Sequence, residues 1–163
     1  MSDALAEYLA TGYQPDREYL DGQVLERNVG EGRHSYALAV LGAWLCGHQK
    51  RLGVVTLASQ RVQVSQTRFR VPDVCVVKKE DFGDIITSPP LLCIEVLSPE
   101  DRWNRVQESI DDYLRFGVPE IWVIDPALAK AWVCTPGAGP RLLEDGVLRW
   151  NGLSLELREI LPE

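Results

Sequence analysis

Apolar residues recur at helical spacing in three segments of the chain. Within residues 33–51 they return every three or four positions, the period of a helix with one buried face, and Gly53 follows as a stop. Residues 3–11 and 101–116 show the same period, and Gly117 is placed to end the last of these segments. Three helices are therefore predicted.

Runs of β-branched and alternating residues predict strands between these helices. Residues 17–28 hold two short runs separated by an Asp-Gly pair, which is typical of a β-hairpin. Three strands are expected between residues 54 and 77. Residues 91–98 are almost continuously apolar, as in a central strand buried on both faces, and residues 120–125 form another strand.

The order of these elements indicates the fold class. A helix, three strands with one more after a loop, a second helix and a last strand across residues 33–125 are typical of an α/β domain with a mixed sheet. Strand, helix and strand within residues 91–125 should form a right-handed crossover. The N-terminal helix and hairpin precede this core, and a C-terminal β meander with a turn at Asp145-Gly146 follows it. We expect one domain over residues 1–163.

Charge is unevenly distributed along the chain. The 17 basic and 24 acidic side chains give a net charge of −7 and a pI of about 4.9, so the whole molecule has no general attraction to nucleic acid. Residues 50–79, however, carry seven basic side chains and only one acidic one, Asp73. These basic residues either contact phosphate groups or are solvent-facing positions on strands, and the sequence leaves both alternatives open.

Apolar runs and cysteine spacing bear on localisation and metal content. No apolar run approaches the roughly 20 residues of a membrane span, and the chain starts without a basic and apolar leader, so we expect a cytoplasmic protein. The widely spaced cysteines lie in apolar contexts and are predicted to be buried, reduced thiols. A zinc site with His34 or His48 would lack the usual paired spacing and is not expected. The four cysteines are Cys46, Cys75, Cys93 and Cys134.

Two acidic residues stand out as candidate chemistry. Glu95 interrupts an otherwise apolar strand, where a carboxylate is costly to bury unless it is paired, hydrogen-bonded or bound to a metal. Asp73 lies on a strand that we expect to pair beside it. Two carboxylates at the same height, with the carbonyl oxygen of Val96, would suit a magnesium ion that keeps open positions for water and a substrate phosphate.

These residues resemble the PD-(D/E)xK nuclease superfamily, and specifically a family of small bacterial restriction-endonuclease-like proteins. The resemblance covers about residues 15–135 and rests on REYLDGQVLER, His34 in GRHSYALAVL, VPDV, EVLSPEDRW and VQESIDDYLRFGVPEIWVIDP. It implies a restriction-endonuclease-like core and hydrolysis of DNA phosphodiester bonds. It also implies Mg²⁺, with Mn²⁺ as a substitute, held by Asp73 and Glu95, and a homodimer, because cutting a duplex needs two sites.

The resemblance also exposes a departure from the family pattern. The superfamily places a lysine two residues after the second acid, where this chain has Leu97, and the bacterial family carries it on the next helix, where this chain has Ser109. Because a serine cannot replace an ammonium group, catalysis is expected to be reduced or absent. Arg105 and Arg102 precede Ser109 on the same side of the helix and are candidates to bind the phosphate.

Four further residues have a functional and a structural interpretation. His34 is a candidate to line the cleft, or it caps or braces its helix. Glu18 and Glu26 are candidates for a further acidic ligand, although solvated strand carboxylates are the commoner outcome. Glu108 is expected to be a solvated helix residue.

Two functions therefore follow from the sequence. The first is a magnesium-dependent DNA endonuclease, impaired at Ser109; the second is an inactive nuclease-fold protein with a binding or regulatory role. An enzyme acting on small molecules is disfavoured, because the chain has no glycine-rich phosphate loop and no G-x-S-x-G motif.

Overall fold

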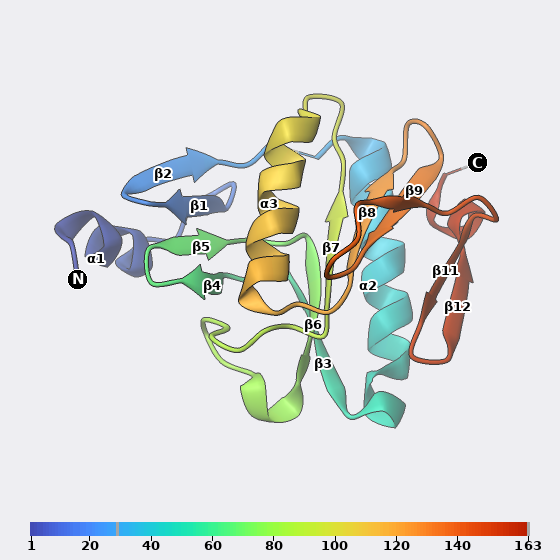
Figure 1. Ribbon diagram of the computed structural model, residues 1–163, viewed down its shortest axis with the longest axis horizontal. Coiled ribbons are helices and arrows are strands. Elements are labelled where there is room, and N and C mark those ends of the chain that lie inside the picture. Colours follow the sequence, from blue (N-terminus) through green and yellow to red (C-terminus); the bar gives the residue numbers. More distant parts are fainter. Residues whose placement is uncertain (29, 163) are drawn as a thin grey trace.

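The computed structural model describes residues 1–28 and 30–162 (Figure 1). The helices are α1 (Asp3–Ala10), α2 (Gly32–Leu52) and α3 (Trp103–Phe116), with the short 3-10 helices η1 (Lys79–Asp81) and η2 (Leu157–Ile160). The strands are β1 (Arg17–Leu20), β2 (Gln23–Glu26), β3 (Val54–Ala58), β4 (Val62–Ser65), β5 (Arg68–Arg70), β6 (Val74–Lys78), β7 (Leu92–Val96), β8 (Ile121–Asp125), β9 (Lys130–Cys134), β10 (Arg141–Leu142), β11 (Val147–Trp150) and β12 (Leu153–Glu156).

A six-stranded mixed sheet forms the centre of the molecule. Its strand order is β10-β9-β8-β7-β6-β3, with β7 and β8 parallel and the other neighbours antiparallel. Figure 1 shows α3 lying over one face of this sheet, as the connection between the two parallel strands. The predicted α/β fold with a mixed sheet is confirmed.

Apolar side chains of the central strands point to both faces of the six-stranded sheet, which explains why helices cover both of these faces. Leu92 and Ile94 of β7 pack in one apolar core with Leu41 of α2, whereas Cys93 packs in a second core with Ile110 of α3. Because side chains alternate between faces, Glu95 follows Cys93 on the α3 side. The prediction that this strand is buried on both faces is therefore confirmed.

The prediction of three strands between residues 54 and 77 is wrong. Four strands occupy residues 54–78, and the run FRVPDVCVV is divided between β5 and β6. Strands β4 and β5 leave the central sheet and join the predicted hairpin in a second sheet of order β2-β1-β5-β4, grouped at the left of Figure 1. Pro72 lies at the division, where its missing N–H cannot continue a ladder.

The C-terminal meander is two separate units, which corrects a second prediction. Strands β9 and β10 extend the central sheet, whereas β11 and β12 form an independent hairpin that packs Leu148 and Leu155 into the core under α2. The predicted turn at Asp145-Gly146 is present and leads from β10 into β11, and the β11–β12 hairpin itself turns at Asn151-Gly152, with φ of 50° and 79°. Both turn residues need positive φ, which asparagine and glycine tolerate best.

Three of the seven basic side chains of this segment are used internally, so neither alternative from the sequence describes the segment fully. Arg70 is completely buried, and Arg68 pairs with Glu108 at 2.6 Å. Arg61 donates to the Thr11 carbonyl at 2.6 Å. The remaining four side chains are exposed, as expected of solvent-facing positions, and are those of Lys50, Arg51, Lys78 and Lys79.

Two further observations concern the cysteines and the membrane. Cys75, Cys93 and Cys134 are buried as predicted, but Cys46 is exposed, because it lies on the outer side of α2 away from Leu41 and Leu45. In the described part of the chain, the helices are too short or too polar to span a bilayer.

Candidate active site

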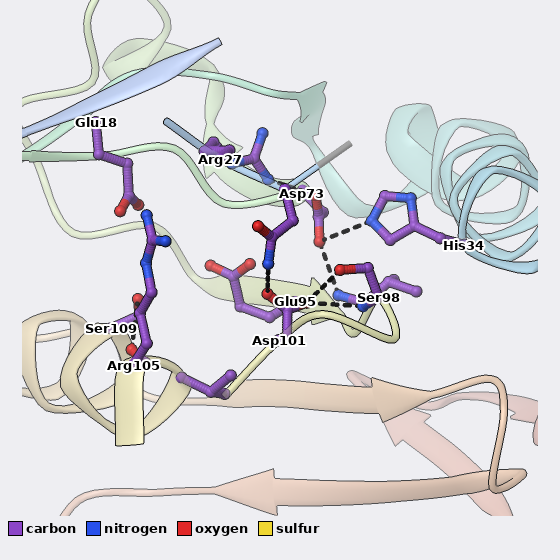
Figure 2. A pocket seen from close by; sticks show the side chains of 12 residues that line it. Glu18, Arg27, His34, Asp73, Glu95, Ser98, Asp101, Arg105 and Ser109 are labelled. Carbon is purple, nitrogen blue, oxygen red and sulfur yellow. Dashed lines mark hydrogen bonds and ion pairs between the residues drawn. The ribbon is translucent and has the colours of Figure 1, made fainter. Parts of the chain in front are cut away.

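Pairing of β6 with β7 brings the two predicted acidic residues together. Val74 lies opposite Ile94 in this antiparallel pair, so Asp73, just before β6, is beside the end of β7 that carries Glu95. The carboxylate of Asp73 accepts a hydrogen bond from the Val96 N–H at 2.8 Å. Both acids line a small pocket of about 70 Å³ between α2, α3 and the ends of these strands (Figure 2). The predicted juxtaposition is present.

Asp73 is held in its ionised form by its neighbours. Its side chain is 6% exposed, and its Oδ1 accepts a hydrogen bond from Nη2 of Arg27 at 2.5 Å. Burial acts to raise the pKa of Asp73, but the contact with His34 and the charge of Arg27 outweigh this effect and hold the pKa below its usual value. Asp73 is therefore a carboxylate with a partner for each oxygen.

Glu95 has the opposite electrostatic environment. Burial, followed by the nearby charge of Asp73, raises the pKa of Glu95 well above its ordinary value of 4.5. The hydroxyl of Tyr113, on α3, donates to Oε1 of Glu95 at 2.7 Å and partly opposes this shift. Glu95 thus binds a proton more readily than an ordinary glutamate, and a cation arriving in the pocket would favour its ionised form.

Helix α3 supplies the wall opposite the acids. Ser109 and Arg105 both line the pocket, one helical turn apart. Arg105 donates to the Glu26 carbonyl at 2.6 Å, so its guanidinium reaches from α3 to the end of β2. Arg102 is exposed and does not line the pocket, so of the two predicted arginines only Arg105 faces the acids.

His34 belongs to the pocket and does not cap its helix. Its Nε2 lies 3.5 Å from Oδ2 of Asp73, and the N-cap position of α2 is Glu31. The ring packs against Gly30, where an added Cβ would lie 2.1 Å from Nδ1 of His34. Gly30 therefore leaves the space that this histidine needs to reach Asp73.

The other glutamates have structural partners. Glu18 lines the same pocket and is buried, which makes the solvated alternative wrong for this residue. Its carboxylate accepts bonds from Arg70 at 2.9 Å and from the Val71 N–H at 3.2 Å. Glu26 is exposed and pairs with Arg17, as the solvated alternative predicts. Glu108 is half exposed but pairs with Arg68, so it is more constrained than expected.

Several residues of the pocket were not predicted from the sequence. Asn28 donates to Asp101 at 2.7 Å, and Asp101 in turn accepts from the Ser98 N–H at 2.7 Å. The S-P-E-D order of residues 98–101 is a turn pattern that could have indicated the second bond. Arg27 has no comparable local signal, because its partner Asp73 is 46 positions away.

The carboxylates of the pocket provide part of the ligand shell of a magnesium ion. Among residues 1–28 and 30–162, no three His, Cys, Asp or Glu side chains are grouped closely enough to hold an ion by themselves. Magnesium commonly binds through one or two carboxylates and completes its shell with water and substrate phosphate. Asp73 and Glu95 provide two hard oxygen ligands of this kind, and Val96 lines the same pocket.

Comparison with known proteins shows the family of the chain. The sequence model of the Uma2 family, described as "Putative restriction endonuclease", matches residues 5–163. The chain belongs to this family. The predicted resemblance to restriction-endonuclease-like proteins is therefore confirmed, and this Uma2 protein is nuclease-like.

A solved structure supports the fold of this Uma2 protein. A protein from Anabaena variabilis ATCC 29413, described as a putative nuclease belonging to DUF820, superposes with a TM-score of 0.85. The match covers 96% of each chain at 21% sequence identity. No curated protein matches the sequence. The roles of individual site residues stay predictions, argued from their geometry.

Proposed function

We propose that this Uma2 protein is a magnesium-dependent endonuclease that hydrolyses DNA phosphodiester bonds, with a chemical step slowed by Ser109. The observation that carries the proposal is that Asp73, just before β6, and Glu95, on β7, line one pocket together with Arg105. Keeping Glu95 among buried apolar residues is costly, and a metal ligand is one role that accounts for this cost.

Asp73 and Glu95 would hold the ion, with the Val96 carbonyl as the third candidate ligand. When bound, Mg²⁺ would lower the pKa of a coordinated water and polarise the phosphate. The Val96 N–H and the Gly30-supported His34 fix the orientation of Asp73. Tyr113 holds one oxygen of Glu95 through its hydroxyl, which leaves the other oxygen of that carboxylate for the ion.

Ser109 supports the impairment. Its hydroxyl has only a long hydrogen bond of 3.4 Å to the Arg105 carbonyl and brings no charge to the pocket. Arg105 is the positive side chain of α3 that lines this space, and a guanidinium can bind a phosphate through two parallel hydrogen bonds. An arginine does not act as a base. Arg105 would therefore stabilise negative charge on the phosphate, as the lysine would, but it would not accept a proton.

The proposed substrate and assembly follow from the family and from the chemistry. A duplex has two antiparallel strands, so a homodimer with one pocket per subunit would place one site on each strand. The acidic net charge offers no general attraction to DNA, so binding would depend on local groups such as Arg105 and the exposed lysines.

Calorimetric titration with Mn²⁺ and Mg²⁺, run beside cleavage of supercoiled plasmid by the same sample, tests the proposal. We expect metal binding together with slow cleavage, and both should be lost in Glu95→Gln, which keeps the side-chain shape but removes the charge. Glu100→Gln, an exposed acid near the pocket, is the matched control and should behave as the parent. Double-strand cuts would support a dimer, and nicks alone a monomer.

Two results would contradict the proposal. Metal binding that survives Glu95→Gln would remove Glu95 from the ligand set. Glu95-dependent metal binding without cleavage of plasmid DNA, under any condition that loads the site, would favour the inactive binding protein instead.

A further inference from the structure

Arg27 lies where an ion held by Asp73 would have to bind. Oδ1 of Asp73 accepts from Arg27 Nη2 at 2.5 Å, and Oδ2 accepts from the Val96 N–H at 2.8 Å. Nε2 of His34 lies 3.5 Å from the same Oδ2. A magnesium ion at the usual ~2.0–2.1 Å from Oδ1 would therefore share that oxygen with a guanidinium. Two cations on one carboxylate oxygen repel each other strongly.

Arg27 is the internal cation of this acidic group. Its side chain is 18% exposed, and burial would by itself lower the pKa of Arg27. The charges of Asp73, Glu95 and Glu18 overcome this effect and raise the pKa above the ordinary arginine value. Through its direct contact with Oδ1, the guanidinium of Arg27 balances the charge of Asp73.

The surroundings of Arg27 offer a second position for its guanidinium. Arg27, His34 and Asp73 also line a neighbouring cavity of about 310 Å³, outside the acid pocket. Tyr13 and Asp16 also line this cavity, and their side chains carry an aromatic ring and a carboxylate. An arginine side chain is long and flexible enough to exchange one carboxylate for another across such a space.

We propose that Arg27 competes with the divalent ion for Asp73, so that metal loading requires the guanidinium to leave Asp73 and turn into the neighbouring cavity. The inference rests on the proposed function, since it takes Asp73 and Glu95 as the metal ligands. It adds a residue that the family resemblance did not assign. Arg27 is a positioning residue in the metal-free protein, and it sets the affinity of the site.

The decisive experiment compares Mn²⁺ binding by Arg27→Gln and Arg105→Gln, each with circular dichroism to check the fold. Both variants remove one positive charge from the same pocket, but only Arg27 is bonded to an acidic ligand, because Arg105 donates to a backbone carbonyl. We expect Arg27→Gln to bind Mn²⁺ about tenfold more tightly than the parent, the range of a strong coupling between two sites. Arg105→Gln should show a clearly smaller gain.

The outcomes separate this inference from the proposed function. Glu95-dependent Mn²⁺ binding by the parent with equal or weaker binding by Arg27→Gln would overturn the inference alone. Tighter binding by Arg27→Gln without cleavage by any variant would overturn the proposed nuclease activity alone. Absence of binding in both proteins would overturn the two together.

A measurement on the unmodified protein covers the case in which Arg27→Gln does not fold. The Nε–Hε NMR signal of Arg27 should shift or broaden as Mg²⁺ is added, in step with the binding curve. The same signal of Arg68, whose acidic partners lie away from the pocket, should stay in place. An Arg27 signal that does not respond while Mg²⁺ binds through Glu95 would contradict the proposed displacement.

Discussion

At the scale of the residue, the proposed function depends most on Glu95 and Ser109. Glu95 is a carboxylate on a strand whose other members are buried, and its hydrogen-bond partner is a single tyrosine hydroxyl among the contacts described. Ser109 faces it from α3 and carries no charge. The pocket therefore combines a buried acid that suits a metal with a serine at the position where the family pattern has a lysine.

Replacing Ser109 with lysine should restore the missing charge. We expect Ser109→Lys to cleave plasmid DNA at least about tenfold faster than the parent, since one well-placed charge or donor is worth that much or more in a transition state. Initial rates with Mn²⁺ and with Mg²⁺ measure the effect. Ser109→Gln adds a similar length without charge and should show no gain; equal rates for the two variants would mean that side-chain size, and not charge, matters at this position.

At the scale of the element, an ion-pair network joins α3 to β5 and β1 of the second sheet. Arg70 on β5 is fully buried and bonds to Asp112 of α3 at 2.7 Å and to Glu18 of β1 at 2.9 Å. Arg68 adds a contact to the same Asp112 at 2.9 Å. Because β1 also leads into β2 and Arg27, this network helps to place α3 and the hairpin around the pocket.

Removing the shared acid of this network should destabilise the fold. We expect Asp112→Asn to lower the free energy of unfolding by roughly 3–5 kcal/mol, because it leaves the buried Arg70 charge without one of its partners. Urea denaturation followed by circular dichroism measures the change. Asp111→Asn, the next residue of α3, which only accepts from Gln107, is the control and should cost less than about 0.5 kcal/mol. Similar losses in the two variants would contradict the role given to the network.

At the scale of the whole molecule, the two acids of the pocket make the stability of the fold depend on pH. Folding holds the pKa of Glu95 above its unfolded value, so the folded state binds a proton more tightly there than the unfolded chain does. Stability is therefore lost as the pH rises from about the ordinary value of 4.5 through the raised pKa. Asp73 acts in the opposite sense, since its lowered pKa contributes stability that is lost only as the pH falls below its ordinary value of 3.8.

Melting temperatures measured over a range of pH test the predicted contribution of Glu95 to stability. With metal removed by a chelator, Glu95→Gln should melt above the parent at neutral pH, and the difference should shrink as the pH falls toward the ordinary pKa of glutamate. The neutral amide avoids the cost of burying a charge. Glu100→Gln should follow the parent at every pH. A constant difference between Glu95→Gln and the parent would show that Glu95 does not titrate in this range.

The local sequence pattern was enough to predict those elements whose apolar residues follow a regular period or run, or whose turn has a typical residue pair. The apolar period of α2 and α3, the Asp-Gly turn of the β1–β2 hairpin and the unbroken apolar run of β7 each carry their own signal, and each was predicted. The division of FRVPDVCVV between two sheets was not, because Pro72 marks an irregularity without saying which sheet each half joins. The turn at Asn151-Gly152 also has a local signal, an Asn-Gly pair, but the sequence analysis named only the turn at Asp145-Gly146.

The sequence by itself determined the fold class, the acid pair Asp73 and Glu95 and the absence of the lysine at Ser109, because these depend on residue type and on nearby order. Only the tertiary structure decided which cation meets which acid. Arg27 reaches Asp73 across 46 positions, and Arg70 reaches Glu18 across 52. Charges pair by distance in space, so such partners leave no periodic trace in the chain.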